Sequence, residues 1–197
     1  IWALYKYDDA LYYIKRQMIF AVLGFIAMFV TSRIDYHLYK KYYKFILIIC
    51  FLLLILVLIP GLGVVRGGSR SWFNFGIFAL QPSELFKIGI IIFSAVYMEK
   101  HYYHMKKIRY SLPVLLMMGL GFLLIMLQPD FGSGVVMACS VIVMMIVSPF
   151  PFRYFVGLGI LGVIGIVIMI LSAPYRMERI LSFLNPFQDP LGSGFQA

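Results

Sequence analysis

Charged residues are scarce in this chain of 197 residues, and acidic residues are the scarcest of them. Charged side chains make up 13% of the sequence, with eight acidic against 17 basic residues, while 62% of the residues are hydrophobic. A soluble domain carries about 25% charged residues, so this composition argues against a soluble fold and a disordered tail. The net charge of +9 lies in short clusters between apolar runs, which favours a membrane protein facing anionic lipid over a nucleic-acid-binding protein.

Cysteine is rarer still, with two residues. Cys50 and Cys139 both lie inside apolar runs, and they give no basis for a disulfide or a metal site. The sequence opens on Ile1, with no initiator methionine and no signal-peptide pattern. We therefore expect the chain to be a fragment of a longer membrane protein.

Long apolar stretches dominate the sequence. A membrane span needs about 20 mostly apolar residues, and six candidate spans lie at 14–34, 45–65, 80–98, 112–127, 133–148 and 154–172. Each stretch is continuous rather than alternating, which favours helices over transmembrane strands. The sequence therefore predicts an all-α polytopic membrane protein, with a single partial membrane domain over 1–197.

The basic residues between the spans indicate an orientation. Nine fall in connections that would face the cytoplasm by the positive-inside rule: Arg33, Lys40, Lys41, Lys44, Lys100, Lys106, Lys107, Arg109 and Arg153. Seven fall on the other side: Lys6, Lys15, Arg16, Arg66, Arg70, Arg176 and Arg179. This bias is weak, but it becomes clear if the last four arginines, which lie in loops that resemble binding sites, are reserved for a ligand.

Arg66 and Arg70 flank a Gly-Gly-Ser sequence in the connection 65–76, and Trp72 follows them. Arginine offers a fork of donors and glycine lets backbone amides approach an anion, so this pattern suits a phosphate or diphosphate group. The alternative is a flexible interfacial loop whose arginines touch lipid phosphates and whose Trp72 lies at the headgroups. The loop alone favours this second interpretation.

Glu84 and Lys87 follow Pro82 at the start of the third span. Proline suits the first turn of a helix, glutamate suits its positive end, and residues three apart share a face on which they can pair. An ionisable pair at membrane depth is a candidate functional site. A structural ion pair that locks the helix to its neighbours is an equal alternative, and both roles can coexist.

Three further patterns favour structural or solvent-exposed roles. Asp130 lies in the tight turn Gln-Pro-Asp-Phe-Gly-Ser-Gly at 128–134, where a cap on the following helix is the favoured interpretation. Glycines recur in the last span, at 157, 159, 162 and 165, and this spacing predicts a face for helix packing. His101 and His104 have helical spacing but no nearby carboxylate or cysteine, so a solvated pair is favoured over a metal site.

The segment after the last span combines arginines with a carboxylate. Arg176 and Arg179 would share a helical face, and Asp189 lies in a loop rich in proline and glycine on the same outer side. A carboxylate near arginines can act as a general base while the arginines hold an anionic leaving group. The alternative, which the segment alone favours, is an Asp-Pro turn in which the side chain bonds its own backbone.

Together these motifs resemble the shape, elongation, division and sporulation (SEDS) family, whose members include RodA, FtsW and SpoVE, with loops most similar to the SpoVE and FtsW branch. Six matching motifs occur in order at span boundaries: an entry motif made of Tyr-Lys-Tyr-Asp-Asp at 5–9 and Lys-Arg-Gln at 15–17, Gly-Ser-Arg-Ser-Trp at 68–72, Gln-Pro-Ser-Glu-Leu at 81–85, Gln-Pro-Asp-Phe-Gly at 128–132, Pro-Tyr-Arg at 174–176 with Arg179, and Asn-Pro-Phe-Gln-Asp-Pro-Leu-Gly-Ser-Gly-Phe-Gln at 185–196. One such segment would be a weak signal, but six in order are strong.

The resemblance implies a fold of ten transmembrane helices, of which this chain would hold six, with residues 173–197 opening a large extracellular loop. It also implies a peptidoglycan glycosyltransferase. Such an enzyme polymerises lipid II into glycan strands at the outer face of the bacterial cytoplasmic membrane and releases undecaprenyl diphosphate. The process served, whether cell division, cell shape or sporulation, stays open.

The resemblance assigns roles to individual residues. Asp189 would be catalytic and accept the proton of the attacking hydroxyl. The arginines at 66, 70, 176 and 179 would hold the diphosphate, and Glu84 and Lys87 would line or brace the polar cavity. The implied partners are lipid II, the nascent glycan strand, membrane lipid and a class B penicillin-binding protein acting as transpeptidase, with no nucleic acid. No motif requires a cofactor or a metal, although a divalent cation beside the diphosphate stays open, and the alternatives are a lipid II flippase and a non-catalytic scaffold for a transpeptidase.

Overall fold

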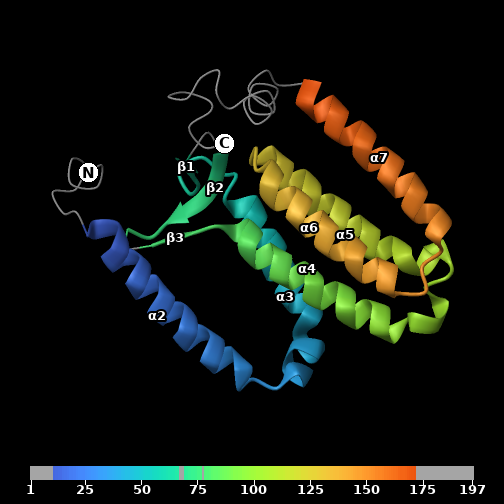
Figure 1. Cartoon of the computed structure of the whole chain (residues 1–197), viewed down its shortest axis with the longest axis horizontal. Coiled ribbons are helices and arrows are strands. Elements are labelled where there is room, and N and C mark those ends of the chain that lie inside the picture. The colour runs from blue at the N-terminus through green and yellow to red at the C-terminus, as the bar shows by residue number, and fades with distance from the viewer. Residues whose placement is uncertain (1–10, 67–68, 77, 172–197) are drawn as a thin grey trace. The chain divides into compact units, whose positions relative to one another are not determined.

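The computed structural model describes residues 11–66, 69–76 and 78–171. Within these residues the chain forms six α-helices, a short 3-10 helix and a small sheet (Figure 1). In chain order the elements are α2 Tyr12–Ser32, α3 Tyr36–Leu56, β1 Val64–Arg66, β2 Ser69–Asn74, β3 Ala79–Leu80, α4 Pro82–Lys100, η1 Tyr102–His104, α5 Ile108–Leu127, α6 Phe131–Val147 and α7 Phe152–Leu171. The helical fold class that the apolar runs predict is thereby confirmed.

Short polar residues begin several of these helices. Asp35 precedes α3, and its carboxylate accepts a hydrogen bond from the backbone N–H of His37 at 3.0 Å. Asp130 precedes α6 and accepts from the backbone N–H of Ser133 at 3.3 Å. Glu84 lies in the first turn of α4, where the helix dipole favours a negative charge. These caps satisfy N–H groups that a helix leaves without internal partners.

The chain divides into two compact units. One comprises Ile1–Lys100 with Val114–Ile142, and the other comprises His101–Pro113 with Val143–Ala197. In the first unit α3 packs along α4, and its core contains fully buried side chains such as Leu54, Phe86 and Ile90. In the second unit the backbone oxygen of Met105 accepts from the Ser111 hydroxyl at 3.1 Å, with Met105 fully buried.

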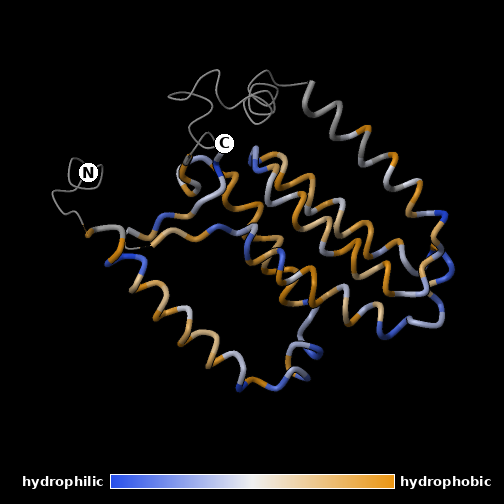
Figure 2. The backbone as a smooth tube through the Cα atoms, in the orientation of Figure 1, coloured by the Kyte–Doolittle hydropathy of each residue, from blue (hydrophilic) through white to orange (hydrophobic). Residues whose placement is uncertain are grey.

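Figure 2 shows mostly hydrophobic residues along α2, and many large apolar side chains of this helix are exposed, among them Met18, Phe25 and Phe29. Among the described residues, Ile14–Ser32 and Ile108–Leu127 are long and apolar enough to cross a membrane, and Phe131–Val147 is a shorter apolar helix. Every described side chain of α2 is exposed. In a bilayer such side chains face lipid tails or other helices rather than water, so their exposure fits a membrane protein.

The second helix differs from the expected span 45–65. Helix α3 begins at Tyr36 and ends at Leu56, because the cap at its start extends it over the lysine- and tyrosine-rich segment that was expected to be a loop. Beyond its end, Pro60 lacks an N–H and Gly61 adopts a φ of +94°. Proline and left-handed glycine both stop a helix, and the chain then turns into β1.

Residues 65–66 and 69–74 of the connection belong to an antiparallel sheet, whereas the pattern alone favours a flexible interfacial loop. Strands β1 and β2 make a hairpin in which Arg66 lies opposite Ser69, and β2 pairs with β3 through Phe73 and Leu80. The strand order is β1-β2-β3. This sheet is an addition to the all-α architecture that the sequence predicts, and it gives Arg70 a fixed place on a strand.

Candidate functional site

Polar side chains gather where the sheet meets the start of α4 and the turn between α5 and α6, all within the first unit. Strand β2 contacts α4, and hydrogen bonds connect both elements to residues 128–130. We call the hydrogen-bonded group the polar cluster, and its members are Ser69, Ser71, Gln81, Ser83, Gln128 and Asp130. Arg70 lies between the two serines on β2, and the Glu84–Lys87 pair lies in the first turns of α4. Three motif segments that the sequence presents separately therefore meet at one place.

The serines of β2 attach the strand to the turn. The Ser69 hydroxyl donates a hydrogen bond to the backbone oxygen of Gln128, and it lies 2.9 Å from the Ser71 hydroxyl. Ser71 is 1% exposed. Because a buried hydroxyl needs a partner, this pair holds β2 against the turn.

The two arginines of the connection lie on neighbouring strands. Arg66 ends β1 opposite Ser69, and Arg70 lies on β2 opposite Val65 with its side chain half-buried. The Arg70 side chain passes close to Gly63. A Cβ added at Gly63 would lie 3.0 Å from the Cγ atom of Arg70 and 1.9 Å from the backbone oxygen of Val57. Only glycine fits at residue 63, and this close approach fixes the start of the arginine side chain.

Glu84 and Lys87 pair on one face of α4, as their spacing predicts. The Lys87 ammonium donates to the Glu84 carboxylate at 2.8 Å, and the exposed fractions of the two side chains are 19% for Lys87 and 57% for Glu84. A surface pair of this spacing contributes only about 0.2–0.5 kcal/mol to helix stability. Both partners lie on α4, so this ion pair joins no second helix, and the mostly buried ammonium of Lys87 places a positive charge in the first turns of α4.

Asp130 caps α6 as expected, but its second carboxylate oxygen has partners that the sequence did not suggest. That oxygen accepts from the Gln81 side-chain amide at 2.5 Å and lies 3.5 Å from the Ser83 hydroxyl. Gln81 in turn precedes α4, and its backbone oxygen accepts from the N–H of Glu84 at 3.1 Å. One carboxylate thus joins the starts of α4 and α6.

Gln128 is completely buried and reaches a third helix. Its side-chain amide donates to the backbone oxygen of Leu54 at 3.1 Å. That oxygen is free at the end of α3 because the N–H of Leu58 bonds to Ile55 instead. The Gln128 side-chain oxygen has no hydrogen-bond partner within the described part of the chain.

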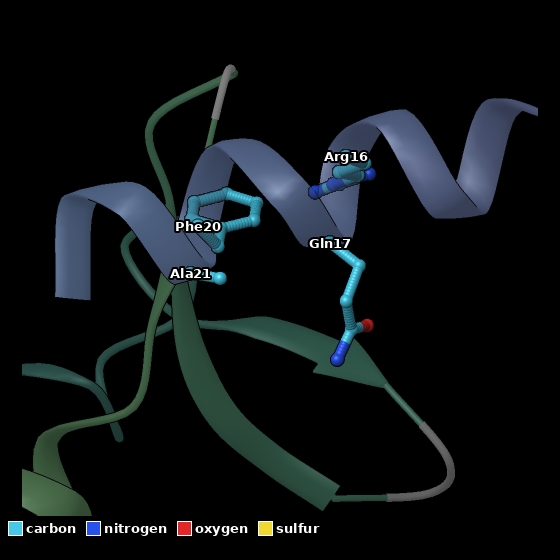
Figure 3. A pocket seen from close by; sticks show the side chains of 4 residues that line it. All are labelled: Arg16, Gln17, Phe20 and Ala21. Atoms are coloured by element: carbon cyan, nitrogen blue, oxygen red, sulfur yellow. The ribbon is translucent and has the colours of Figure 1, made fainter. Parts of the chain in front are cut away.

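A separate hollow of about 400 Å³ opens beside α2 (Figure 3). It is lined by Arg16, Gln17, Phe20 and Ala21, and the Arg16 guanidinium lies 5.7 Å from the centre of the Phe20 ring. Figure 3 shows these four side chains projecting from neighbouring turns of the helix. The hollow combines a cationic group with an apolar wall, which suits an amphiphilic molecule.

Several predicted site residues do not belong to the polar cluster. Asp189, Arg176 and Arg179 fall outside the described residues. Within the described ranges, no group of three or more histidine, cysteine, aspartate or glutamate side chains gathers where it could hold a metal ion. His101 and His104 instead lie near the ring of Tyr110, at centroid distances of 5.8 and 5.0 Å.

Sequence reasoning missed five members of the cluster: Ser69, Ser71, Gln81, Ser83 and Gln128. Their signal was present, since each is a polar residue inside a motif that resembles the SEDS family. It was not specific, because serine and glutamine are also ordinary residues of turns and helix starts.

Known proteins place this chain in a family. All 197 residues match the family model for FtsW, RodA and SpoVE, described as cell cycle proteins. The chain is 47% identical to stage V sporulation protein E of Bacillus subtilis, covering 100% of this chain and 54% of that protein. It is 36% identical to a probable peptidoglycan glycosyltransferase FtsW of Geobacter metallireducens, covering 100% and 52% of the two. The chain thus spans about half the length of these relatives.

Solved structures agree with the sequence relatives. A structure of a peptidoglycan synthase complex matches with a TM-score of 0.75 and 32% identity, over 92% of this chain and 54% of that chain. The crystal structure of the rod shape determining protein RodA of Thermus thermophilus matches with a TM-score of 0.64 and 30% identity, over 76% and 49%. Both the motif order and the fold lead to the same assignment: this chain belongs to the FtsW, RodA and SpoVE family of polytopic membrane proteins.

Proposed function

We propose that the full-length protein is a peptidoglycan glycosyltransferase of the bacterial cytoplasmic membrane. It polymerises lipid II into glycan strands at the outer face and releases undecaprenyl diphosphate, in division, cell shape or sporulation. The observation that carries the proposal is the polar cluster between β2 and α4, the two contacting elements that carry the positive charges of Arg70 and Lys87. Relatives named as probable peptidoglycan glycosyltransferases support the reaction type.

The proposed chemistry uses one carboxylate and several arginines. A hydroxyl of the acceptor attacks the anomeric carbon of the lipid-linked donor, forming a C–O bond while the bond to the diphosphate breaks. Asp189 takes the hydroxyl proton. The arginines at 66, 70, 176 and 179 hold the diphosphate, which receives the electron pair of the broken bond, and Glu84 and Lys87 brace the cavity.

The partner proposed for this protein is a class B penicillin-binding protein, which would crosslink the strands that the glycosyltransferase makes. The matched solved structure is of a peptidoglycan synthase complex that coordinates polymerization and crosslinking, and this supports the pairing. Lipid II, the nascent strand and membrane lipid are the remaining proposed partners.

Two other functions use the same features. A flippase would pass a lipid headgroup through a polar cavity of arginine and glutamate, and a scaffold would only recruit the transpeptidase. Polymerisation of purified lipid II by the full-length protein, with and without its penicillin-binding protein, separates the three. Adding a chelator tests whether the diphosphate needs a divalent cation.

Asp189→Asn is the decisive variant. We expect it to abolish polymerisation, whereas Asp35→Asn, a control at the exposed start of α3, leaves polymerisation unchanged. Normal polymerisation by Asp189→Asn contradicts the catalytic assignment. Movement of lipid II across vesicles without polymerisation by the parent protein favours the flippase, and a loss of partner binding alone favours the scaffold.

A further inference from the structure

The turn at residues 128–130 holds together three elements of the first unit. It reaches the end of α3 through Leu54, strand β2 through Ser69 and the start of α4 through Gln81. These contacts span 74, 59 and 49 residues of sequence. A turn that only connected α5 to α6 would need none of them.

The contact with α4 acts on the Glu84–Lys87 pair. Gln81 directly precedes the helix, and the carboxylate of Asp130 fixes its side-chain amide at 2.5 Å. Hydrogen bonds to an ionised acceptor are about twice as strong as neutral ones. Because Lys87 lies less than two turns along the same helix, the position of its ammonium depends on where α4 begins.

The contact with β2 acts on Arg70. Ser69 donates to the backbone oxygen of Gln128 and is the neighbour of Arg70 on the strand. The Gln128 side chain is completely buried, so it does not touch a substrate in this arrangement. Its side-chain amide joins the turn to α3. This contact fixes the position of the Gln128 backbone oxygen, to which Ser69 of β2 donates.

We propose that Gln128 and Asp130 are positioning residues, which hold Arg70 on β2 and Lys87 on α4 in one arrangement for binding a lipid-linked diphosphate. The inference rests on the proposed function, since it deepens the anion site of that reaction. Neither residue is a catalytic group in this scheme. Both act through neighbours that carry the positive charge.

A reciprocal exchange between residues 81 and 130 tests the contact with α4. Gln81→Glu sets two carboxylates against each other, whereas Gln81→Glu combined with Asp130→Asn restores a single carboxylate facing an amide. The probe is undecaprenyl diphosphate, bound to the purified full-length protein in nanodiscs, and lipid II polymerisation is followed in parallel. We expect Gln81→Glu to weaken binding at least about tenfold and to lower kcat/KM, and the double variant to recover to within about threefold of the parent.

Glu99→Gln is the matched control. It removes the negative charge from an exposed contact of the same length, 2.5 Å to Lys40, at the opposite end of α4, and it should leave the affinity for undecaprenyl diphosphate unchanged. A merely structural role for the Gln81–Asp130 contact would reduce the folded fraction without changing the affinity of the molecules that remain folded. Affinity is therefore measured on the monodisperse fraction after size-exclusion chromatography.

Ser69→Ala and Ser69→Thr test the contact with β2 independently, in case Gln81→Glu does not fold. Alanine removes the hydroxyl and should weaken binding about threefold or more, while threonine keeps a hydroxyl and should bind as the parent does. Parental affinity in both Gln81→Glu and Ser69→Ala overturns the inference, as does a double variant no better than Gln81→Glu. In those cases the parent still binds and polymerises, whereas a parent that does neither overturns the proposed function as well.

Discussion

Gly121 on α5 lies directly against the ring of Phe86 on α4, and its replacement should be costly. A Cβ added at Gly121 would lie 2.2 and 2.3 Å from two atoms of that ring. The ring has little room to retreat, because Phe86 is completely buried and packs edge-on against Phe51 at a centroid distance of 4.8 Å. We therefore expect Gly121→Ala to push α4 and α5 apart.

The magnitude follows from comparing two glycines of the same helix. Overpacking a well-packed core costs about 1–3 kcal/mol, while replacing a helical glycine by alanine gains about 1 kcal/mol in helix propensity. A Cβ added at Gly119 meets no atom within 4 Å, so Gly119→Ala has only the gain. The free energies of unfolding of Gly119→Ala and Gly121→Ala should therefore differ by about 1–3 kcal/mol, with Gly121→Ala the less stable.

The measurement is reversible unfolding of the full-length protein in mixed micelles, at increasing mole fractions of SDS, followed by circular dichroism. Adding Phe86→Leu to Gly121→Ala should recover part of the loss, because the ring atoms that meet the new methyl group are removed. Equal stabilities for Gly119→Ala and Gly121→Ala would refute the close packing of α4 on α5 at this position.

Three other variants test separate features of the chain. Glu84→Gln should change the free energy of unfolding by less than about 0.5 kcal/mol. It should nevertheless slow lipid II polymerisation about tenfold, because the mostly buried Lys87 ammonium loses its counter-ion. A parental polymerisation rate would show that the pair has a structural role only. A hydrogen bond from the backbone N–H of His37, and a second one with the His37 side chain, lower the pKa of the Asp35 carboxyl. The stability that this cap contributes is therefore fully present above about pH 3.9, the pKa of an unperturbed aspartate, and is lost as the pH falls through the lowered pKa. Hydrogen exchange at the His37 amide should show this loss, and Asp35→Asn should keep the protection without the pH dependence. Lys107→Cys, in a full-length protein whose native cysteines, Cys50 and Cys139 included, are replaced by alanine, should react with an impermeant thiol reagent only from the cytoplasmic side, and labelling from outside would reverse the orientation.

The helices were predictable because a continuous apolar run in a membrane has one way to satisfy its backbone. The Glu84–Lys87 pair was equally predictable, since a spacing of three residues on a helix brings two side chains to one face. In both cases each donor finds its acceptor within one or two turns of the same helix. The local sequence is then sufficient to predict the contact.

The sheet and the turn contacts were not predictable for the opposite reason. Strands of three, six and two residues are too short to show an alternating pattern, and a Gln-Pro-Asp sequence signals a turn without naming a partner 74 residues away at Leu54. Close contacts of individual glycines were not predictable either. A Cβ added at Gly63, Gly89, Gly121 or Gly134 would lie within 3.0 Å of another atom, and nothing in the local sequence names those neighbours. The packing face that the glycine spacing of α7 predicts stays a prediction.

The balance of partners in the polar cluster bears on what it can bind. Asp130 is surrounded by the neutral donors Gln81 and Ser83 and a backbone N–H, and within the described chain it forms no ion pair with Arg70. Lys87 has Glu84, a partner that is itself more than half exposed. The Asp130 carboxylate thus accepts hydrogen bonds from neutral groups, and the Glu84 carboxylate pairs with Lys87. Arg70 lies on a strand and forms no ion pair with a carboxylate among the described residues. In a bundle with so few charges, an arginine fixed in this way favours an anion supplied from outside the chain, and a diphosphate matches its fork of donors.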